Sequence, residues 1–149
     1  MSSVSVKSKP NQDFMPLMRA LVRAYQAFAA YDANGYRDID LTVPQADVLF
    51  TLGNTEGLTF KEIGTLTLIT KGTLTGVIDR MEDKGLVKRV NQPDDRRCTR
   101  VVLTTKGTKL FDQLFPKQLA YIKERFDRMD TASQQEAVKH LRKIKEIFS

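Results

Sequence analysis

Basic, hydroxyl-bearing and small residues recur between residues 70 and 80, where they would share one face of a helix. Leu74, Val77, Ile78 and Met81 recur in the same stretch with a helical period and predict its buried face. The opposite face can approach the phosphates and base edges of a nucleic-acid groove. The candidate contact residues on this face are Thr70, Lys71, Gly72, Thr73, Thr75 and Arg80.

A second group of basic residues follows at the tip of a predicted hairpin. After Gly85, which fits the left-handed cap of the preceding helix, apolar and polar residues alternate around the turn-like run PDDRRCTR. The aspartates of this run can hold a guanidinium group in place, and arginine suits the negative potential of a narrow minor groove. A surface turn whose charges neutralise one another is the alternative. The candidate contact residues here are Asp95, Arg96, Arg97 and Arg100.

The positive charge of the chain is concentrated on these two elements. The 149-residue chain has a net charge of +6, and residues 71–109 hold ten Lys or Arg against five Asp or Glu. A basic patch of this kind is typical of proteins that bind a phosphate backbone, because neutralised phosphates release their counterions. A solvated lysine face is the alternative interpretation of the charge.

Capping signals predict where the neighbouring helices begin. Thr42 and Gln45 have the spacing of a capping box, and Thr59 and Glu62 repeat it. Helices are therefore predicted to start at both positions. Thr70 is the natural N-cap of the helix that carries the first group of candidate residues.

Three further helices are predicted outside this region, over residues 13–34, 105–129 and 130–149. The first carries apolar residues around more of its circumference than one core requires, so we expect it to be buried against a second subunit. A one-sided amphipathic helix is the alternative. Thr131 and Gln134 give the last helix another capping-box spacing.

Together these elements predict a mainly α-helical fold with a small β-hairpin wing. Residues 42–104 are expected to form a winged helix-turn-helix, and residues 12–34 and 105–149 to form dimerisation helices. Residues 12–149 would then make one domain after a disordered tail at residues 1–11. A bundle shared by two chains would hold two nucleic-acid-binding helices at a fixed distance.

Several classes of protein do not fit the composition. Cys98 is the only cysteine and His140 the only histidine, so one chain has no disulfide and no Cys/His metal cluster. No orienting group or Gly-rich phosphate loop accompanies either residue, so we expect neither an enzyme nor a cofactor. No signal peptide or membrane-spanning run is seen, and the unpaired thiol suits a reducing compartment, so the expected location is the cytoplasm.

Three blocks of the chain carry a more specific pattern. They read LTVPQADVLFTL, TKGTLTGVIDRMEDKGLVKR and PDDRRCTRVVLTTKG. With these blocks, the sequence from about residue 13 to 148 resembles the MarR family of bacterial transcription regulators. The resemblance implies an obligate homodimer that binds a palindromic operator in double-stranded DNA, with one helix of each subunit in the major groove. It also places Asp95 and Arg97 at the positions of the wing's aspartate and minor-groove arginine.

The chain departs from the family pattern in two places. Gly76 stands where many relatives have a long basic side chain, which puts a contact there in doubt. Thr67 and Leu68 occupy a turn where relatives often have an apolar residue and then a small one. A slight shift between the two flanking helices is therefore expected.

The resemblance also implies a ligand. Members of the family are often released from DNA by small aromatic compounds that bind between the dimerisation helices and the winged domain. The aromatic residues that would line such a pocket are Tyr25, Phe28, Tyr31 and Tyr36, for which core or interface packing is the alternative. A redox role for Cys98 is a weaker hypothesis, because it lies in the wing.

The expected function is therefore a homodimeric, sequence-specific DNA-binding regulator, most simply a repressor released by a small aromatic effector. The alternative is a winged-helix protein-interaction module, in which the basic wing meets an acidic partner. A mobility shift with the DNA that flanks the protein's own gene would distinguish the two, and an operator contact should weaken with rising salt.

Overall fold

The structure, a computed structural model, describes residues 11–92 and 95–149. The side chains of residues 92 and 95–97 also lie outside the described part. The tail predicted for residues 1–11 falls almost wholly outside it, and so do residues 93–94, the first two of the predicted turn.

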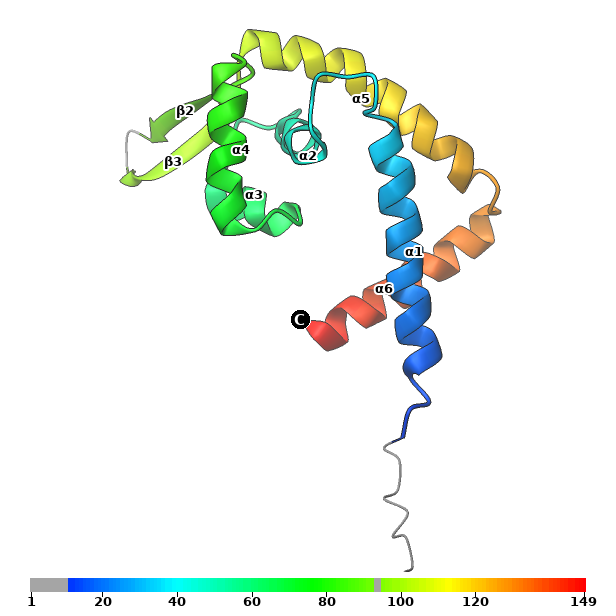
Figure 1. The fold of residues 1–149 in the computed structure, drawn as a ribbon. Helices are drawn as coiled ribbons and strands as arrows, with labels where there is room; N and C mark the ends of the chain where they lie inside the picture. Colours follow the sequence, from blue (N-terminus) through cyan, green and yellow to red (C-terminus); the bar gives the residue numbers. More distant parts are fainter. Residues whose placement is uncertain (1–10, 93–94) are drawn as a thin grey trace, which may run out of the picture.

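Within the described residues the chain forms a helical molecule with one small sheet (Figure 1). The elements in chain order are α1 (Met15–Asn34), α2 (Val43–Leu52), β1 (Leu58–Thr59), α3 (Phe60–Leu66), α4 (Lys71–Asp83), β2 (Val87–Gln92), β3 (Asp95–Leu103), α5 (Thr105–Phe126) and α6 (Thr131–Phe148). Figure 1 shows α2, α3, α4 and the hairpin on one side and α1 with α6 on the other, while α5 runs between the two groups. The predicted fold class, mainly α with a small β-hairpin wing, is confirmed.

The sheet is antiparallel and has the strand order β1-β3-β2. Val87 of β2 pairs with Leu103 of β3 at the base of the hairpin, while Leu58 of β1 pairs with Val101 on the other edge of β3. The sequence pattern missed β1, because two residues are too few to show a period of two. The prediction of a turn as far as residue 100 is also wrong, since β3 already begins at Asp95.

Apolar side chains from α2, α3, α4 and β3 meet in one core, which α5 covers. Leu49 of α2, Ile63 of α3 and Ile78 of α4 are each 0% exposed. Burying a side chain of this size contributes about 1.5–3 kcal/mol, so the core fixes α4 against its neighbours. The four apolar positions predicted for the inner face of α4 are all buried: Leu74, Val77, Ile78 and Met81.

The predicted capping boxes are formed to different degrees. At α2, the Gln45 N–H donates to Thr42 Oγ1 and the Thr42 N–H donates to Gln45 Oε1, so the box is complete. At α3, the Glu62 N–H donates to Thr59 Oγ1, but the Glu62 carboxylate accepts the Thr59 hydroxyl instead of the backbone N–H. Half of the second box is therefore present.

The box predicted at the start of α6 is replaced by a different cap. The Ser133 N–H donates to the Asp130 carboxylate, and this bond lowers the pKa of Asp130. The amide of Gln134 instead donates at 2.9 Å each to the carbonyls of Phe126, the last residue of α5, and Met129. The side chain of Gln134 thus ties α6 to the end of α5, which lies three residues earlier than predicted.

The helices at the two ends of the chain leave most of their apolar side chains uncovered. Neither α1 nor α6 has a buried residue. Leu17 in α1 is 57% exposed and Phe148 in α6 is 82% exposed. The prediction that the first helix carries more apolar surface than one chain buries is confirmed, whereas its burial by a second subunit stays a prediction.

Candidate nucleic-acid interface

The outer side of α4 presents the first group of predicted contact residues. Their side chains are all exposed: Thr70, Lys71, Gly72, Thr73, Thr75 and Arg80. A Cβ added at Gly72 would meet no atom within 4 Å, so the backbone there is open to close approach. Arg80 Nη1 lies 3.7 Å from where a Cβ of Gly76 would be, so this guanidinium occupies space that a side chain at Gly76 would fill. We call this surface the α4 face.

A threonine occupies the N-cap position of α4, but its side chain makes no capping hydrogen bond. Thr70 is the N-cap residue, as predicted. Its hydroxyl donates to Thr73 Oγ1 at 3.0 Å, and neither hydroxyl accepts a backbone N–H of the first turn. The backbone N–H groups of the first turn therefore have no side-chain acceptor among the described residues. Such a helix N-terminus carries partial positive charge and suits a phosphate.

The end of α4 connects tightly to the hairpin. Gly85 has a φ of 73°, in the left-handed region that favours glycine, as predicted. The Leu86 N–H donates to the Met81 carbonyl at 3.0 Å and the Gly85 N–H to the Glu82 carbonyl at 2.8 Å. These two backbone hydrogen bonds form a Schellman motif, so α4 leads into β2 without a flexible linker.

Arg89 of β2 holds the hairpin against the acidic side of α4. Its guanidinium donates to Asp79 Oδ1 at 2.6 Å and forms a second ion pair with Glu82. It also lies 5.5 Å from the ring centre of Phe60 in α3. Because Arg89 neutralises Asp79, the acid at the edge of the α4 face does not repel a phosphate. Sequence reasoning missed this residue, although two acids three positions apart on a helix followed by a basic strand are the signal for it.

The hairpin residues are less clustered than predicted. The backbones of Asp95, Arg96 and Arg97 form the start of β3, and their side chains lie outside the described part. Arg100 lies in the middle of β3 opposite Val90, and its Nη1 donates to the Gly57 carbonyl at 3.0 Å. The prediction that Arg100 shares a tight turn with the other arginines is wrong, because the strand extends through all of them. Contact of these residues with DNA stays a prediction.

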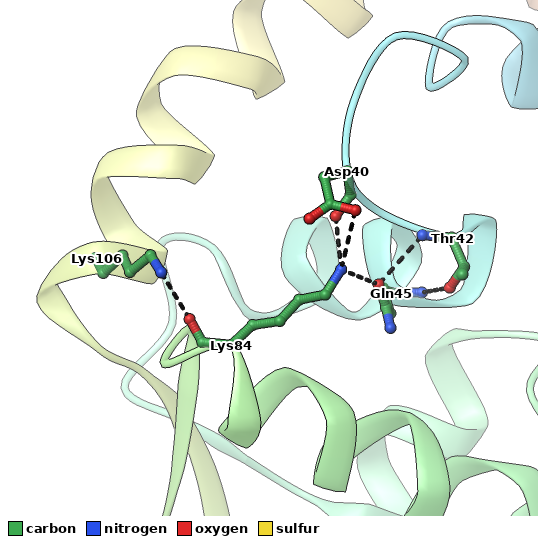
Figure 2. Close-up of polar contacts among 5 residues, drawn as sticks. All are labelled: Asp40, Thr42, Gln45, Lys84 and Lys106. Carbon is green, nitrogen blue, oxygen red and sulfur yellow. Dashed lines mark hydrogen bonds and ion pairs between the residues drawn. The ribbon is translucent and has the colours of Figure 1, made fainter.

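A lysine at the end of α4 ties this helix to α2 and to the loop before it (Figure 2). Lys84 Nζ donates to the Asp40 carbonyl at 2.6 Å and to Gln45 Oε1 at 3.2 Å. Gln45 is the residue that closes the capping box of α2. The Lys106 side chain, from the first turn of α5, donates to the Lys84 carbonyl at 2.8 Å. Three helices therefore meet at Lys84.

We expect Lys84→Met to lower the free energy of unfolding by about 1 kcal/mol, the usual net value of a hydrogen bond. Methionine keeps the apolar stem of the side chain and removes only its donors. Asp40→Asn is the matched control, because the Asp40 carboxylate is fully exposed and lies 3.8 Å from Lys84 Nζ. Urea denaturation would measure both variants. An equal loss for Asp40→Asn would show that the ion pair, rather than the backbone carbonyl, supplies the stability.

A cavity of about 420 Å³ lies between α1, α2, α5 and the turn before α4. Tyr25, Phe28 and Tyr36, three of the four predicted ligand residues, line it. Leu68, two residues before the N-cap of α4, also lines it and is 76% exposed. We call this cavity the interhelical pocket.

Tyr31, the fourth predicted ligand residue, lies outside the lining of this pocket. Its ring stacks on Tyr121 of α5 with centroids 4.1 Å apart. The Tyr31 hydroxyl donates to the Tyr121 carbonyl at 2.7 Å, and the Tyr121 hydroxyl donates to the Tyr31 carbonyl at 2.9 Å. Arg125 lies 4.6 Å from the Tyr31 ring centre. This tyrosine pair fixes α1 on α5 in the same chain. Tyr31 therefore has the packing contacts that were the alternative to a role in ligand binding.

Two carboxylates face the interhelical pocket from neighbouring helices. Asp32 of α1 accepts hydrogen bonds from the Tyr36 hydroxyl at 3.2 Å and from Gln118 Nε2 at 2.8 Å. Asp47 of α2 is half-buried, and desolvation together with the negative charge of Asp32 raises its pKa to about 6. Burial and the nearby Asp32 also raise the pKa of Tyr36, so its hydroxyl stays a donor. Sequence reasoning did not single out Asp32 or Asp47.

Other kinds of site are not found in the described part of the chain. Residues 11–92 and 95–149 contain no group of three or more His, Cys, Asp or Glu side chains placed to hold a metal ion. In the same ranges no helix is both long and apolar enough to cross a membrane. Cys98 lies half-buried in β3.

The geometry of helix, turn, helix and hairpin agrees with what known proteins show. The model of the MarR family matches residues 39–97. The transcriptional regulator MhqR of Bacillus subtilis is 31% identical over 110 residues, which cover 74% of this chain and 76% of MhqR. The chain belongs to the MarR family. MarR-family proteins are DNA-binding transcriptional regulators rather than enzymes.

Two further relatives show how far the likeness extends. The regulator TtmR of Methylorubrum extorquens is 38% identical over 91 residues, or 61% of this chain and 43% of TtmR. The chain thus spans about half the length of three of the curated relatives that it matches, 43% to 54%. A solved structure of BpsR from Bordetella bronchiseptica, whose DNA binding is regulated by 6-hydroxynicotinic acid, has a TM-score of 0.76 and 28% identity, covering 92% of this chain and 98% of BpsR.

Proposed function

We propose that this MarR-family chain is a cytoplasmic repressor that binds a palindromic operator as a homodimer and leaves it when a small ligand binds. The α4 face would enter the major groove and the tip of the hairpin the adjacent minor groove. The observation that carries the proposal is the exposed α4 face itself. It joins a helix N-terminus without a side-chain cap to Lys71 and Arg80, and Arg89 neutralises Asp79 at its edge.

The homodimer is supported by the apolar surface at the two ends of the chain. Leu17, Met18 and Val22 on α1 are exposed, as are Leu141 and Ile147 on α6. A monomeric protein seldom leaves such large apolar residues grouped in the open. Burying α1 and α6 of two chains against each other would cover them and would pair two α4 faces, as a palindromic operator requires.

Release by a ligand is supported by the position of the interhelical pocket. Thr67 and Leu68 line it and lie in the turn that leads directly into Thr70, the N-cap of α4. A ligand in the pocket would push on this turn and so move the α4 face. The precedent is BpsR, whose DNA binding a small aromatic acid regulates.

Selection of bound fragments from genomic DNA, followed by fluorescence anisotropy at 50–200 mM salt, tests the proposal. We expect a palindromic site and a log–log slope of about −0.9 for each phosphate neutralised. Arg97→Ala should cost about 1–3 kcal/mol of operator binding without changing the thermal unfolding temperature. A slope near zero would contradict the proposal and favour a protein-interaction module.

A further inference from the structure

In the described part of the chain, the interhelical pocket has apolar walls and charged residues of one sign only, which is negative. Its walls are aromatic and aliphatic, with Phe28 from α1, Phe50 from α2 and Phe115 from α5 among them. Its charged lining residues are Asp32 and Asp47, and no Lys, Arg or His lines it among the described residues. An apolar cavity with a few polar groups at one place is the usual form of a small-molecule site.

The two carboxylates differ in how they are held. Asp32 is fixed by the Tyr36 hydroxyl and by Gln118 Nε2, both of which are neutral donors. The Asp47 carboxylate has no hydrogen bond and no ion pair within the described residues, although it is half-buried beside a second acid. A positive charge placed between them would remove this unfavourable arrangement.

We propose that the interhelical pocket takes an organic cation, with its ammonium group between Asp32 and Asp47 and its apolar body against the phenylalanine rings. The inference deepens the proposed release by a ligand and rests on it. An ammonium group gains from both carboxylates and from the faces of the surrounding rings. A carboxylate or phenolate ligand would instead bring a third negative charge into a partly desolvated site without a cation, which is unfavourable.

Three probes of similar size separate the effect of charge from that of shape. They are 2-phenylethylamine, which is cationic, 2-phenylethanol, which is neutral, and phenylacetate, which is anionic. Isothermal titration of the full chain without DNA at pH 7.5 would measure their affinities. We expect the amine to bind at least about tenfold more tightly than the alcohol, which corresponds to 1.4 kcal/mol or more. Phenylacetate should bind most weakly. Absence of amine binding, or an affinity for phenylacetate equal to that for the amine, would overturn the proposal.

Two substitutions test whether Asp47 is responsible. Asp47→Asn keeps the shape of the side chain and removes its charge, so it should abolish most of the preference for the amine over the alcohol. Asp112→Asn is the matched control, because Asp112 is an exposed acid of α5 that does not line this pocket. A preference that survives in Asp47→Asn would count against the proposed place of the ammonium group.

The affinity for the amine should also depend on pH. Tyr25, Asp32, Tyr36 and Asp47 are the titratable groups that line the pocket, and α5 and the turn before α4 add none. Asp47 has a pKa near 6, so its charge is present above that pH and is lost below it. The amine stays protonated throughout, since its pKa is near that of lysine, about 10.4. Its affinity should therefore fall between pH 7.5 and pH 5, and a constant affinity would contradict the role of Asp47.

The same titration predicts a difference in stability without ligand. The pKa of Asp47 is higher in the folded chain than in the unfolded chain, so its contribution to stability is lost as pH rises through about 6. Asp47→Asn should therefore raise the unfolding temperature at pH 7.5 and raise it by a smaller amount at pH 5, where the folded chain is mostly protonated at Asp47 but the unfolded chain is not. An unchanged temperature at both values would show that Asp47 is not confined in the pocket as described.

Anisotropy with operator DNA keeps this inference separate from the proposed function. If the amine binds and also lowers operator affinity, both are supported. If the amine binds without any effect on operator affinity, the cationic class of ligand is supported, and the proposal that this pocket controls release of DNA is contradicted. If phenylacetate releases the DNA and the amine does not, regulation stands and the cation is ruled out.

Discussion

Replacing Lys71 by glutamate should lower the affinity of the protein for its operator by on the order of 100-fold or more. A hydrogen bond to a charged group is worth about 1.5–3 kcal/mol, and a homodimer loses the contact twice. The fold should survive, because Lys71 is exposed in the first turn of α4, where a negative side chain interacts favourably with the helix dipole. The log–log salt slope should become shallower by about 1.8, which is 0.9 for each of two phosphates.

Lys117→Glu is the control for this variant. It changes the net charge by the same amount, but Lys117 is an exposed residue of α5 rather than of the α4 face. Anisotropy at several salt concentrations would measure both variants, with thermal unfolding as the check on folding. Equal losses of affinity would mean that only the net charge of the protein affects DNA binding and that the α4 face does not contact the operator.

Replacing Gly107 by alanine should destabilise the chain by about 3 kcal/mol or more, at the upper end of the range for overpacking. A Cβ at this position would lie 2.0 Å from the carbonyl oxygen of Leu86. That oxygen accepts the Thr104 N–H at 3.0 Å, and the Gly107 N–H donates to Thr104 Oγ1 at 3.0 Å. Neither partner can move without breaking the start of α5, so the clash is not relieved by a side-chain rotation.

Gly64→Ala supplies a control of opposite sign. Gly64 lies inside α3, and a Cβ there would meet no atom within 4 Å. Alanine should therefore stabilise the helix by about 0.5–1 kcal/mol. Urea denaturation would compare the two variants. A loss of stability for Gly107→Ala no larger than about 1 kcal/mol would show that α5 can shift away from the hairpin.

Structural features that are determined by a short stretch of sequence were predicted correctly. The apolar period of Leu74, Val77, Ile78 and Met81 predicted the buried face of α4, because the repeat of a helix is a local property. The capping box of Thr42 and Gln45 and the left-handed Gly85 were predicted for the same reason. The exposed α4 face then follows as the side that the core does not use.

Features that depend on distant partners were not predicted. Arg100 is held by the Gly57 carbonyl, 43 residues away, and no local signal points to that partner. Asp79 and Glu82 are a local signal for Arg89, but its contact with the Phe60 ring of α3 has none. Asp47 was passed over as an ordinary polar position in a helix. One sign was present, since Val43 and Thr51, four residues to either side, offer no positive charge to pair with it.

The clasp between Tyr31 and Tyr121 bears on how the proposed homodimer would assemble. Its stacked rings and reciprocal hydrogen bonds fix α1 on α5 within one chain. The apolar side of α1 is therefore already ordered before any encounter, so association need not supply the entropy of folding this helix. Assembly would proceed by the docking of two preformed subunits, with a rate that rises with chain concentration, rather than by folding coupled to binding.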